Sequence, residues 1–113
     1  MALRHGPVFR RDPQSDTLLK NVNANGLVYA PAISTDGLEL FFTRVAKITA
    51  TAQPAIYRAA RQRTSEPFDI PERVVGITGF VEGPTLSADG RRLYYHKKEK
   101  SHFYIYVVTR KTK

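Results

Sequence analysis

The carboxylates of this chain are the side chains to test first for acid–base chemistry. Asp36 and Asp89 each stand before a glycine in the pattern Ser-x-Asp-Gly, and Glu82 lies just before the second of these patterns. General acid–base catalysis needs a positioned proton donor and acceptor, and a single carboxylate is not such a pair. An Asp-Gly pair is explained by turn formation, because Asp bonds nearby backbone N–H groups and Gly accepts positive φ. The predicted structural turn residues are Asp36, Gly37, Asp89 and Gly90.

Metal and cofactor chemistry has little support in the residue spacing. The three histidines are His5, His96 and His102, and they form neither a His-x-x-x-His nor a His-Glu-x-x-His motif. The chain has no cysteine, so thiolate ligands and disulfides are excluded. It also lacks a Gly-x-Ser-x-Gly motif, a P-loop and a dinucleotide-binding fingerprint. We therefore predict no metal and no cofactor.

The turn residues belong to a tandem repeat. Residues 30–42 recur as residues 83–95, 53 positions later, and residues 17–44 align with residues 70–97 without a gap. A fixed period of this size is typical of propellers and solenoids. The alignment contains eight identities, which are Val22/Val75, Gly26/Gly79, Val28/Val81, Pro31/Pro84, Ser34/Ser87, Asp36/Asp89, Gly37/Gly90 and Leu40/Leu93.

Each copy is predicted to form a β-hairpin followed by a third strand. A proline at 31 or 84 suits the start of a strand, where its missing N–H costs no ladder bond. An apolar run, the Asp-Gly turn and a second apolar run with aromatic residues follow. A third apolar run closes each unit, at residues 55–58 and 103–108.

The pattern Pro-x-x-Ser-x-Asp-Gly-x-x-Leu-Tyr/Phe-Tyr/Phe, followed by Ile-Tyr and a basic residue, resembles the PD40 repeat, the WD40-like β-propeller repeat of TolB-type proteins. The resemblance covers roughly residues 17–110 and includes the connection at 56–68. Thr35 and Ala88 stand where proline is common in the family. The resemblance implies a propeller fold rather than one function, because propellers host many activities.

The predicted fold is all-β, with two antiparallel four-stranded propeller-like blades that complete a propeller by oligomerisation. An irregular arm at 1–16, with Val8 and Phe9 packed on the core, precedes the first repeat (about 17–69) and the second (about 70–113). Large side chains alternate to both sides of residues 38–44, which indicates burial on both faces. The expected strands are 27–33, 38–44, 55–60 and 72–75, then 80–86, 92–97 and 103–109.

The second unit lacks an outer strand of its own, whereas residues 17–22 are predicted to be an outer strand without a blade. Propellers close with about four to eight blades, so two blades leave two uncovered faces. We expect a homo-oligomeric, head-to-tail ring of two to four chains, preferably three, in which residues 17–22 add the missing strand to a neighbour. The alternative is a fragment, or a two-blade stack that stays monomeric or forms a simple dimer.

The charge of this chain is strongly basic and uneven. The net charge is +8, and residues 91–113 contain eight basic residues against Glu99 alone. Such a field attracts anionic partners at low salt, although a solvated edge is the favoured interpretation. Tyrosines and lysines at 94–98 could stack bases and hold phosphates. The same tyrosines occupy strand positions of the repeat, so we favour a core and interface role over nucleic-acid binding.

Length and composition indicate one soluble globular domain, with 113 residues of which 42% are hydrophobic and 25% charged. No apolar run approaches the ~18 residues of a membrane span, and the N-terminus has no apolar signal segment. As written, the chain is expected in the cytoplasm. The resemblance to TolB-type proteins implies the periplasm or secretion for a chain trimmed of its leader.

The function predicted from these features is a non-catalytic, β-propeller-type binding or scaffolding module for a protein or another ligand. Its ligand contacts are expected at the central channel, from Tyr29, Arg44, Glu82 and Lys97. One alternative is a carbohydrate-active hydrolase or lyase on an oligomeric propeller, which would require Glu82 to be repeated around a ring. The other is a polyanion or nucleic-acid binder that uses the basic C-terminal region.

Overall fold

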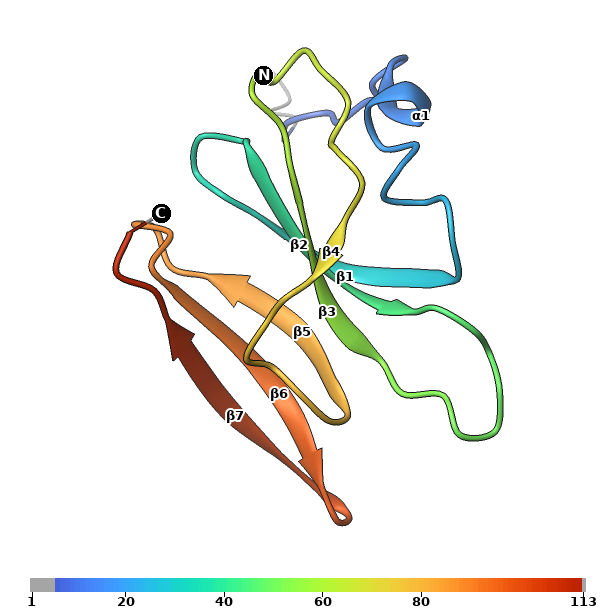
Figure 1. Ribbon diagram of the computed structural model, residues 1–113. Coiled ribbons are helices and arrows are strands. Elements are labelled where there is room, and N and C mark those ends of the chain that lie inside the picture. Colours follow the sequence, from blue (N-terminus) through green and yellow to red (C-terminus); the bar gives the residue numbers. More distant parts are fainter. Residues whose placement is uncertain (1–5, 113) are drawn as a thin grey trace, which may run out of the picture.

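A computed structural model describes residues 6–112 and consists of two stacked antiparallel sheets (Figure 1). The first sheet has the strand order β1-β2-β3-β4 and the second has the order β5-β6-β7, and neither sheet is closed. The predicted all-β class is confirmed. The elements are α1 (Ser15–Leu18), β1 (Leu27–Ile33), β2 (Glu39–Val45), β3 (Ala55–Ala60), β4 (Glu72–Arg73), β5 (Val81–Leu86), β6 (Arg92–Glu99) and β7 (His102–Thr109).

The sequence repeat is also a structural repeat. Val28 pairs with Arg44 in the first sheet, as Val81 pairs with Lys97 in the second. Each first strand has a register shift at the same place, between residues 29 and 32 and between residues 82 and 85. The third strands match with a spacing of 49, because four fewer residues separate the paired positions Lys97 and Tyr104 than separate the equivalent pair Arg44 and Ala55.

The two Asp-Gly turns close their hairpins with identical hydrogen bonds. Ser34 Oγ donates to Asp36 Oδ1 over 2.6 Å, and the backbone N–H of Glu39 donates back to Ser34 Oγ over 2.9 Å. In the second copy, the Ser87 hydroxyl donates to Asp89 over 2.7 Å, and Ser87 accepts the N–H of residue 92 over 3.0 Å. The serine therefore fixes the aspartate within the turn, and proline at the intervening position is not needed.

The main core lies between the two sheets. Phe41 and Ile56 from the first sheet meet Val81, Leu93 and Tyr95 from the second, and all of these side chains are buried. Alternation along β2 is as predicted from the sequence, because residues 41 and 43 face the second sheet whereas residues 40 and 42 enter a second cluster. The inter-sheet core therefore joins the two repeats into one body.

The outer face of the first sheet is covered by the chain itself. Leu19, Val22 and Phe68 pack against Leu40 and Phe42 of β2. Two hydrogen bonds to backbone carbonyls hold the segment of residues 18–22 on this face. Arg44 donates to the carbonyl of Val22 over 2.7 Å, and the backbone N–H of Phe68 donates to the carbonyl of residue 18 over 3.0 Å. The expectation of two uncovered faces is therefore wrong for the first sheet.

The predicted strand at residues 17–22 is wrong. Residues 15–18 form a single helical turn and turns follow it, so that Leu19 and Val22 both reach the apolar face of the sheet. The strand prediction came from the alignment of Val22 with Val75, but Val22 is 6% exposed and Val75 is 98% exposed. Burying two apolar side chains stabilises this segment more than an unpaired extended strand could.

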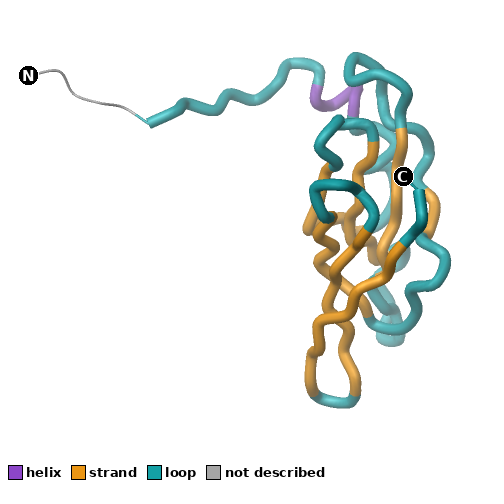
Figure 2. The backbone as a smooth tube through the Cα atoms, turned by 90° about the vertical axis from the view of Figure 1, so that its left-hand side faces the viewer, coloured by secondary structure: helices purple, strands orange, loops and turns teal. Residues whose placement is uncertain are grey.

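The arm before α1 leaves the body of the molecule (Figure 2). Val8 and Phe9 are exposed there, so the prediction that they pack on the core is wrong. In Figure 2 the arm runs away from the sheets, with no other part of the described chain beside it.

Thr43 joins the two sheets through its hydroxyl group. The side chain is fully buried on β2, and its Oγ1 accepts the backbone N–H of Gly83 over 3.0 Å. We expect Thr43→Val to lower the free energy of unfolding by about 1–2 kcal/mol, because the N–H of Gly83 loses its acceptor within a packed interface. Urea denaturation measures this change. Thr51→Val in the exposed connection before β3 is the control, and an equal loss in both variants would contradict the role of this bond.

Candidate functional site

The structure brings two of the four predicted channel residues together. Tyr29 on β1 donates its hydroxyl hydrogen to Glu82 Oε2 on β5, and Glu82 Oε1 lies 3.3 Å from His96 Nε2 on β6. Tyr29 and Glu82 are equivalent positions of the two repeats, so the contact follows from stacking the two first strands. Burial raises the pKa of the Tyr29 hydroxyl, and the hydrogen bond to Glu82 raises it further. The phenol therefore stays protonated and acts as a donor.

This cluster of Tyr29, Glu82 and His96 offers weak support for acid–base catalysis. Both carboxylate oxygens of Glu82 are occupied, one by a phenol and one by an imidazole. A general base must reach the proton of its substrate, and Glu82 would first have to release one of these partners. Within residues 6–112, no group of three or more His, Cys, Asp or Glu residues is arranged to hold a metal ion.

Arg44 and Lys97 do not join this cluster. The Arg44 guanidinium lies 4.8 Å from the ring centroid of Tyr57, and the Lys97 ammonium lies 5.6 Å from that of Tyr106. These are equivalent contacts of the two repeats, each between the second and third strand of a sheet. Both cations thus cover an aromatic ring of their own sheet. His102 is exposed at the start of β7, and His5 lies outside the described residues.

A buried carboxylate that the sequence reasoning missed connects the two sheets. The side chain of Glu39 is 5% exposed and accepts a hydrogen bond from Arg58 Nε over 2.6 Å. Arg110, which follows β7, binds the same carboxylate through two nitrogens over 2.7 and 2.9 Å. The hydrogen bonds from Arg110, with further help from Arg58, hold the pKa of Glu39 below its usual range despite burial.

A sequence signal for Arg110 exists, namely the recurrence of Ile-Tyr-x-x-x-Arg. It ends at Arg61 in the first copy and at Arg110 in the second, 49 residues later. Each arginine donates its Nε hydrogen to the carbonyl of the turn glycine, over 2.9 Å to Gly37 and 2.8 Å to Gly90. The gapless alignment has an offset of 53 residues, so it does not superpose arginines that are 49 residues apart.

The outward face of the second sheet is equivalent, in the repeat, to the face of the first sheet that is buried in the inter-sheet core, but no described part of the chain covers it. Phe41 and Ile56 of the first sheet are 3% and 1% exposed beneath the second sheet. Their equivalents, Tyr94 and Ile105, are 42% and 74% exposed. We define the open face by the four exposed side chains that point away from the inter-sheet core, which are Tyr94, Phe103, Ile105 and Val107.

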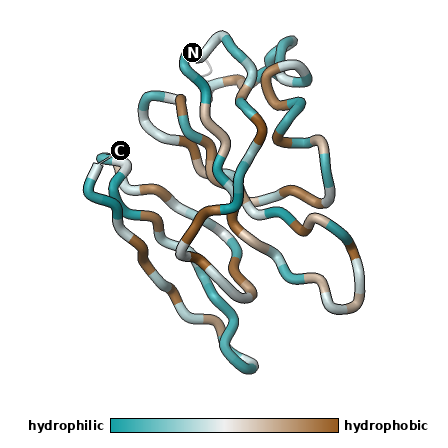
Figure 3. Tube along the Cα trace, in the orientation of Figure 1, coloured by the Kyte–Doolittle hydropathy of each residue, from teal (hydrophilic) through white to brown (hydrophobic). Residues whose placement is uncertain are grey.

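The outer edge of the second sheet is also bare. In the first sheet, β4 pairs with β3 at Tyr57 and Arg58. At the equivalent positions of β7, Tyr106 and Val107, no strand among residues 6–112 pairs on the outer side. Hydrophobic residues run along β7, which lies farthest from the first sheet (Figure 3). The second sheet thus has three strands of its own, as expected from the sequence, and the fourth strand expected from a neighbouring chain stays a prediction.

No protein-family model, curated protein or solved structure matches this chain. The PD40 resemblance therefore stays a prediction that depends on the repeat residues themselves. In the described range 6–112, the only helix is far too short to cross a membrane.

Proposed function

We propose that this protein is a non-catalytic, β-propeller-type binding and scaffolding module that associates through the open face and bare edge of its second sheet. The observation that supports this proposal is the difference between equivalent positions. In the first sheet, the inner face packs against the second sheet and the edge strand β3 pairs with β4. The equivalent face of the second sheet is exposed, and its edge strand β7 has no partner within residues 6–112. The open face of the second sheet is equivalent to the face of the first sheet that packs on a sheet within the chain. It is therefore suited to pack on another sheet.

The composition of this surface favours association. The side chains of the open face are two aromatic and two β-branched residues, and burying such a side chain completely contributes about 1.5–3 kcal/mol. Exposed apolar patches rimmed by polar residues commonly mark interaction sites. A long, exposed and apolar edge strand such as β7 also pairs readily with another strand unless a partner covers it.

The partner we propose is a second copy of this chain. In a head-to-tail ring of two to four copies, the open face would stack on the outer face of the next chain's first sheet. That outer face is already covered by Leu19, Val22 and Phe68, and part of this covering would have to move. Two open faces can instead stack on each other about a two-fold axis, which closes the assembly without displacing any segment. We therefore favour a dimer of this kind over a ring of three.

Sedimentation equilibrium of three proteins tests the proposal. The wild type is expected to sediment at twice the 12.8 kDa chain mass at micromolar concentration. Ile105→Asp is expected to sediment as a monomer, because it places a charge at the centre of the open face. Ile48→Asp is the matched control, since Ile48 is equally exposed but lies in the connection before β3, and it should remain dimeric.

A wild type that stays monomeric at high concentration would contradict self-association. A trimer or tetramer that is lost in Ile105→Asp would support the open face as the interface and would favour the ring over the two-fold dimer. An assembly that survives Ile105→Asp would exclude the open face from the interface.

A further inference from the structure

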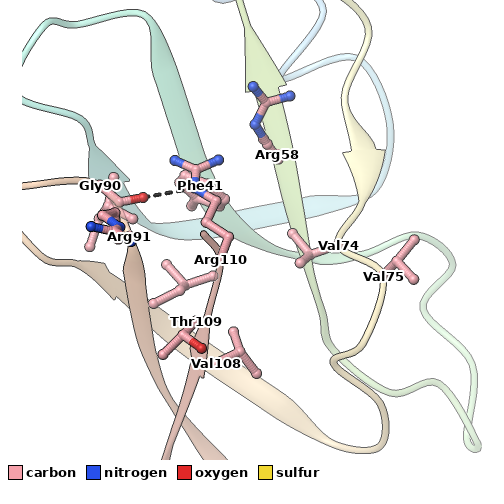
Figure 4. Close-up of a pocket in the computed structure, with 11 residues that line it drawn as sticks. Phe41, Arg58, Val74, Val75, Gly90, Arg91, Val108, Thr109 and Arg110 are labelled. Carbon is pink, nitrogen blue, oxygen red and sulfur yellow. Dashed lines mark hydrogen bonds between the residues drawn. The ribbon is translucent and has the colours of Figure 1, made fainter. Parts of the chain in front are cut away.

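A cavity of about 220 Å³ lies at one side of the inter-sheet core, close to the second Asp-Gly turn (Figure 4). Its walls are apolar and come from both sheets and from the connection between them. In Figure 4, Val74 and Val108 stand on either side of an open space, with Phe41 and Arg110 beside it. The apolar lining consists of Phe41, Val74, Val75, Leu86, Leu93 and Val108.

Three arginines line the same cavity, namely Arg58, Arg91 and Arg110. Arg110 is engaged with Glu39 and with the Gly90 carbonyl. Arg58 donates to Glu39 through Nε, and neither of its two terminal nitrogens makes a further hydrogen bond within residues 6–112. The side chain of Arg91 makes neither a hydrogen bond nor an ion pair in the described part of the chain, although the neighbouring Asp89 carboxylate lies within its electrostatic reach. The lining thus retains unused guanidinium donors beside apolar walls.

The surrounding charge strengthens this feature. A depression of about 460 Å³ is lined by Arg91 and Arg110 as well, together with Arg92, Lys111 and Asp89. The two hollows together are lined by five cationic side chains and by the Asp89 carboxylate. Glu39, which binds Arg58 and Arg110, neutralises one more charge, so three net positive charges remain. A cationic concave surface raises the local concentration of anions.

We propose that this cavity binds a small amphipathic carboxylate, with its apolar chain between the sheets and its carboxylate on Arg91 at the mouth. The cavity is smaller than a pocket for a drug-sized ligand, which starts near about 300 Å³, so a short unbranched acid fits it best. A guanidinium binds a carboxylate through two parallel hydrogen bonds, and Arg110 already binds Glu39 in this way. Free phosphate would satisfy the arginine but would leave the apolar walls without a contact.

Titration of the intact protein with octanoate, monitored by the methyl NMR signals of Val74 and Val108, tests the proposal. We expect saturable shifts of these signals. Arg91→Gln should weaken octanoate binding about tenfold, as the loss of a charge-assisted hydrogen bond implies. Arg63→Gln is the matched control, because Arg63 is exposed and lies outside the cavity, and it should leave the affinity unchanged. Val108→Phe should abolish binding by filling the cavity.

Uncharged octanol and inorganic phosphate separate the two halves of the proposed ligand. Both should bind at least about tenfold more weakly than octanoate, because each lacks one of the two kinds of contact. Absence of saturable shifts with millimolar octanoate would overturn the proposal, as would unchanged affinity in Arg91→Gln. Octanol binding as tightly as octanoate would overturn the role of the carboxylate. These outcomes do not depend on whether the protein forms the proposed dimer.

Discussion

Replacing Glu39 with glutamine is expected to lower the free energy of unfolding by about 3 kcal/mol at neutral pH. The side chain is 5% exposed and carries the only carboxylate that contacts both Arg58 and Arg110 among the described residues. Glutamine is nearly isosteric, but it presents an NH₂ group where an arginine now donates. The two guanidinium groups would then lose a charged acceptor between the sheets, and Arg110 would lose its two-nitrogen contact.

The stabilisation from Glu39 should depend on pH in a defined direction. The arginine hydrogen bonds hold the pKa of Glu39 in the folded protein below its ordinary value of 4.5. A depressed folded pKa means that the carboxylate stabilises the fold fully above the unfolded pKa and loses this effect as the pH falls through the folded pKa. The stability gap between wild type and Glu39→Gln should therefore be largest at neutral pH and shrink towards pH 3.

Urea denaturation of both proteins at several pH values measures this gap. Glu66→Gln is the control, because Glu66 is half exposed and its ion pair with Arg63 is long, at 3.8 Å. An exposed pair of this kind contributes at most about 1 kcal/mol. If Glu39→Gln unfolds at the same urea concentration as the wild type at pH 7, the contacts of this carboxylate between the sheets do not contribute to the free energy of unfolding.

The contacts of Glu39 also show where sequence reasoning ends. The hairpins were predictable because the Ser-x-Asp-Gly turn is made by residues within five positions of one another, and the 53-residue repeat shows it twice. The bond between Glu39 and Arg110 spans 71 residues and depends on how one sheet stacks on the other. Local patterns carry little information about such a contact, although the recurring arginine after Ile-Tyr could have pointed to Arg110.

Identical residues in the two repeats have the same structural role only where the residues that they contact are also equivalent. Val28 and Val81 both occupy the first strand and have equivalent pairing partners. Val22 and Val75 are identical too, but Val22 packs under Phe42 and Phe68 in a cluster that has no counterpart at Val75. Arg44 and Lys97 do have equivalent surroundings, since each lies over an aromatic ring of its own sheet, and their predicted place at a central channel stays a prediction.

Ala30 and Gly83 provide a matched pair of substitutions with opposite expected effects. These residues are equivalent in the two repeats, and both adopt a left-handed backbone, with φ of +55° at Ala30 and +67° at Gly83. A left-handed backbone costs a residue with a Cβ about 1–2 kcal/mol, so Ala30 carries strain that Gly83 avoids.

Gly83→Ala is therefore expected to lower the free energy of unfolding by about 2–3 kcal/mol, because the backbone strain adds to a close contact. The new Cβ would lie 2.9 Å from Cε1 of His96, which must move and weaken its contact with Glu82. Ala30→Gly should relieve the strain but increase the entropy of the unfolded chain, for a net gain of about 0.5 kcal/mol. Urea denaturation compares the two variants. The strain argument requires changes of opposite sign in the free energy of unfolding. An equal decrease in both variants would therefore contradict the claim that Ala30 carries backbone strain that Gly83 avoids.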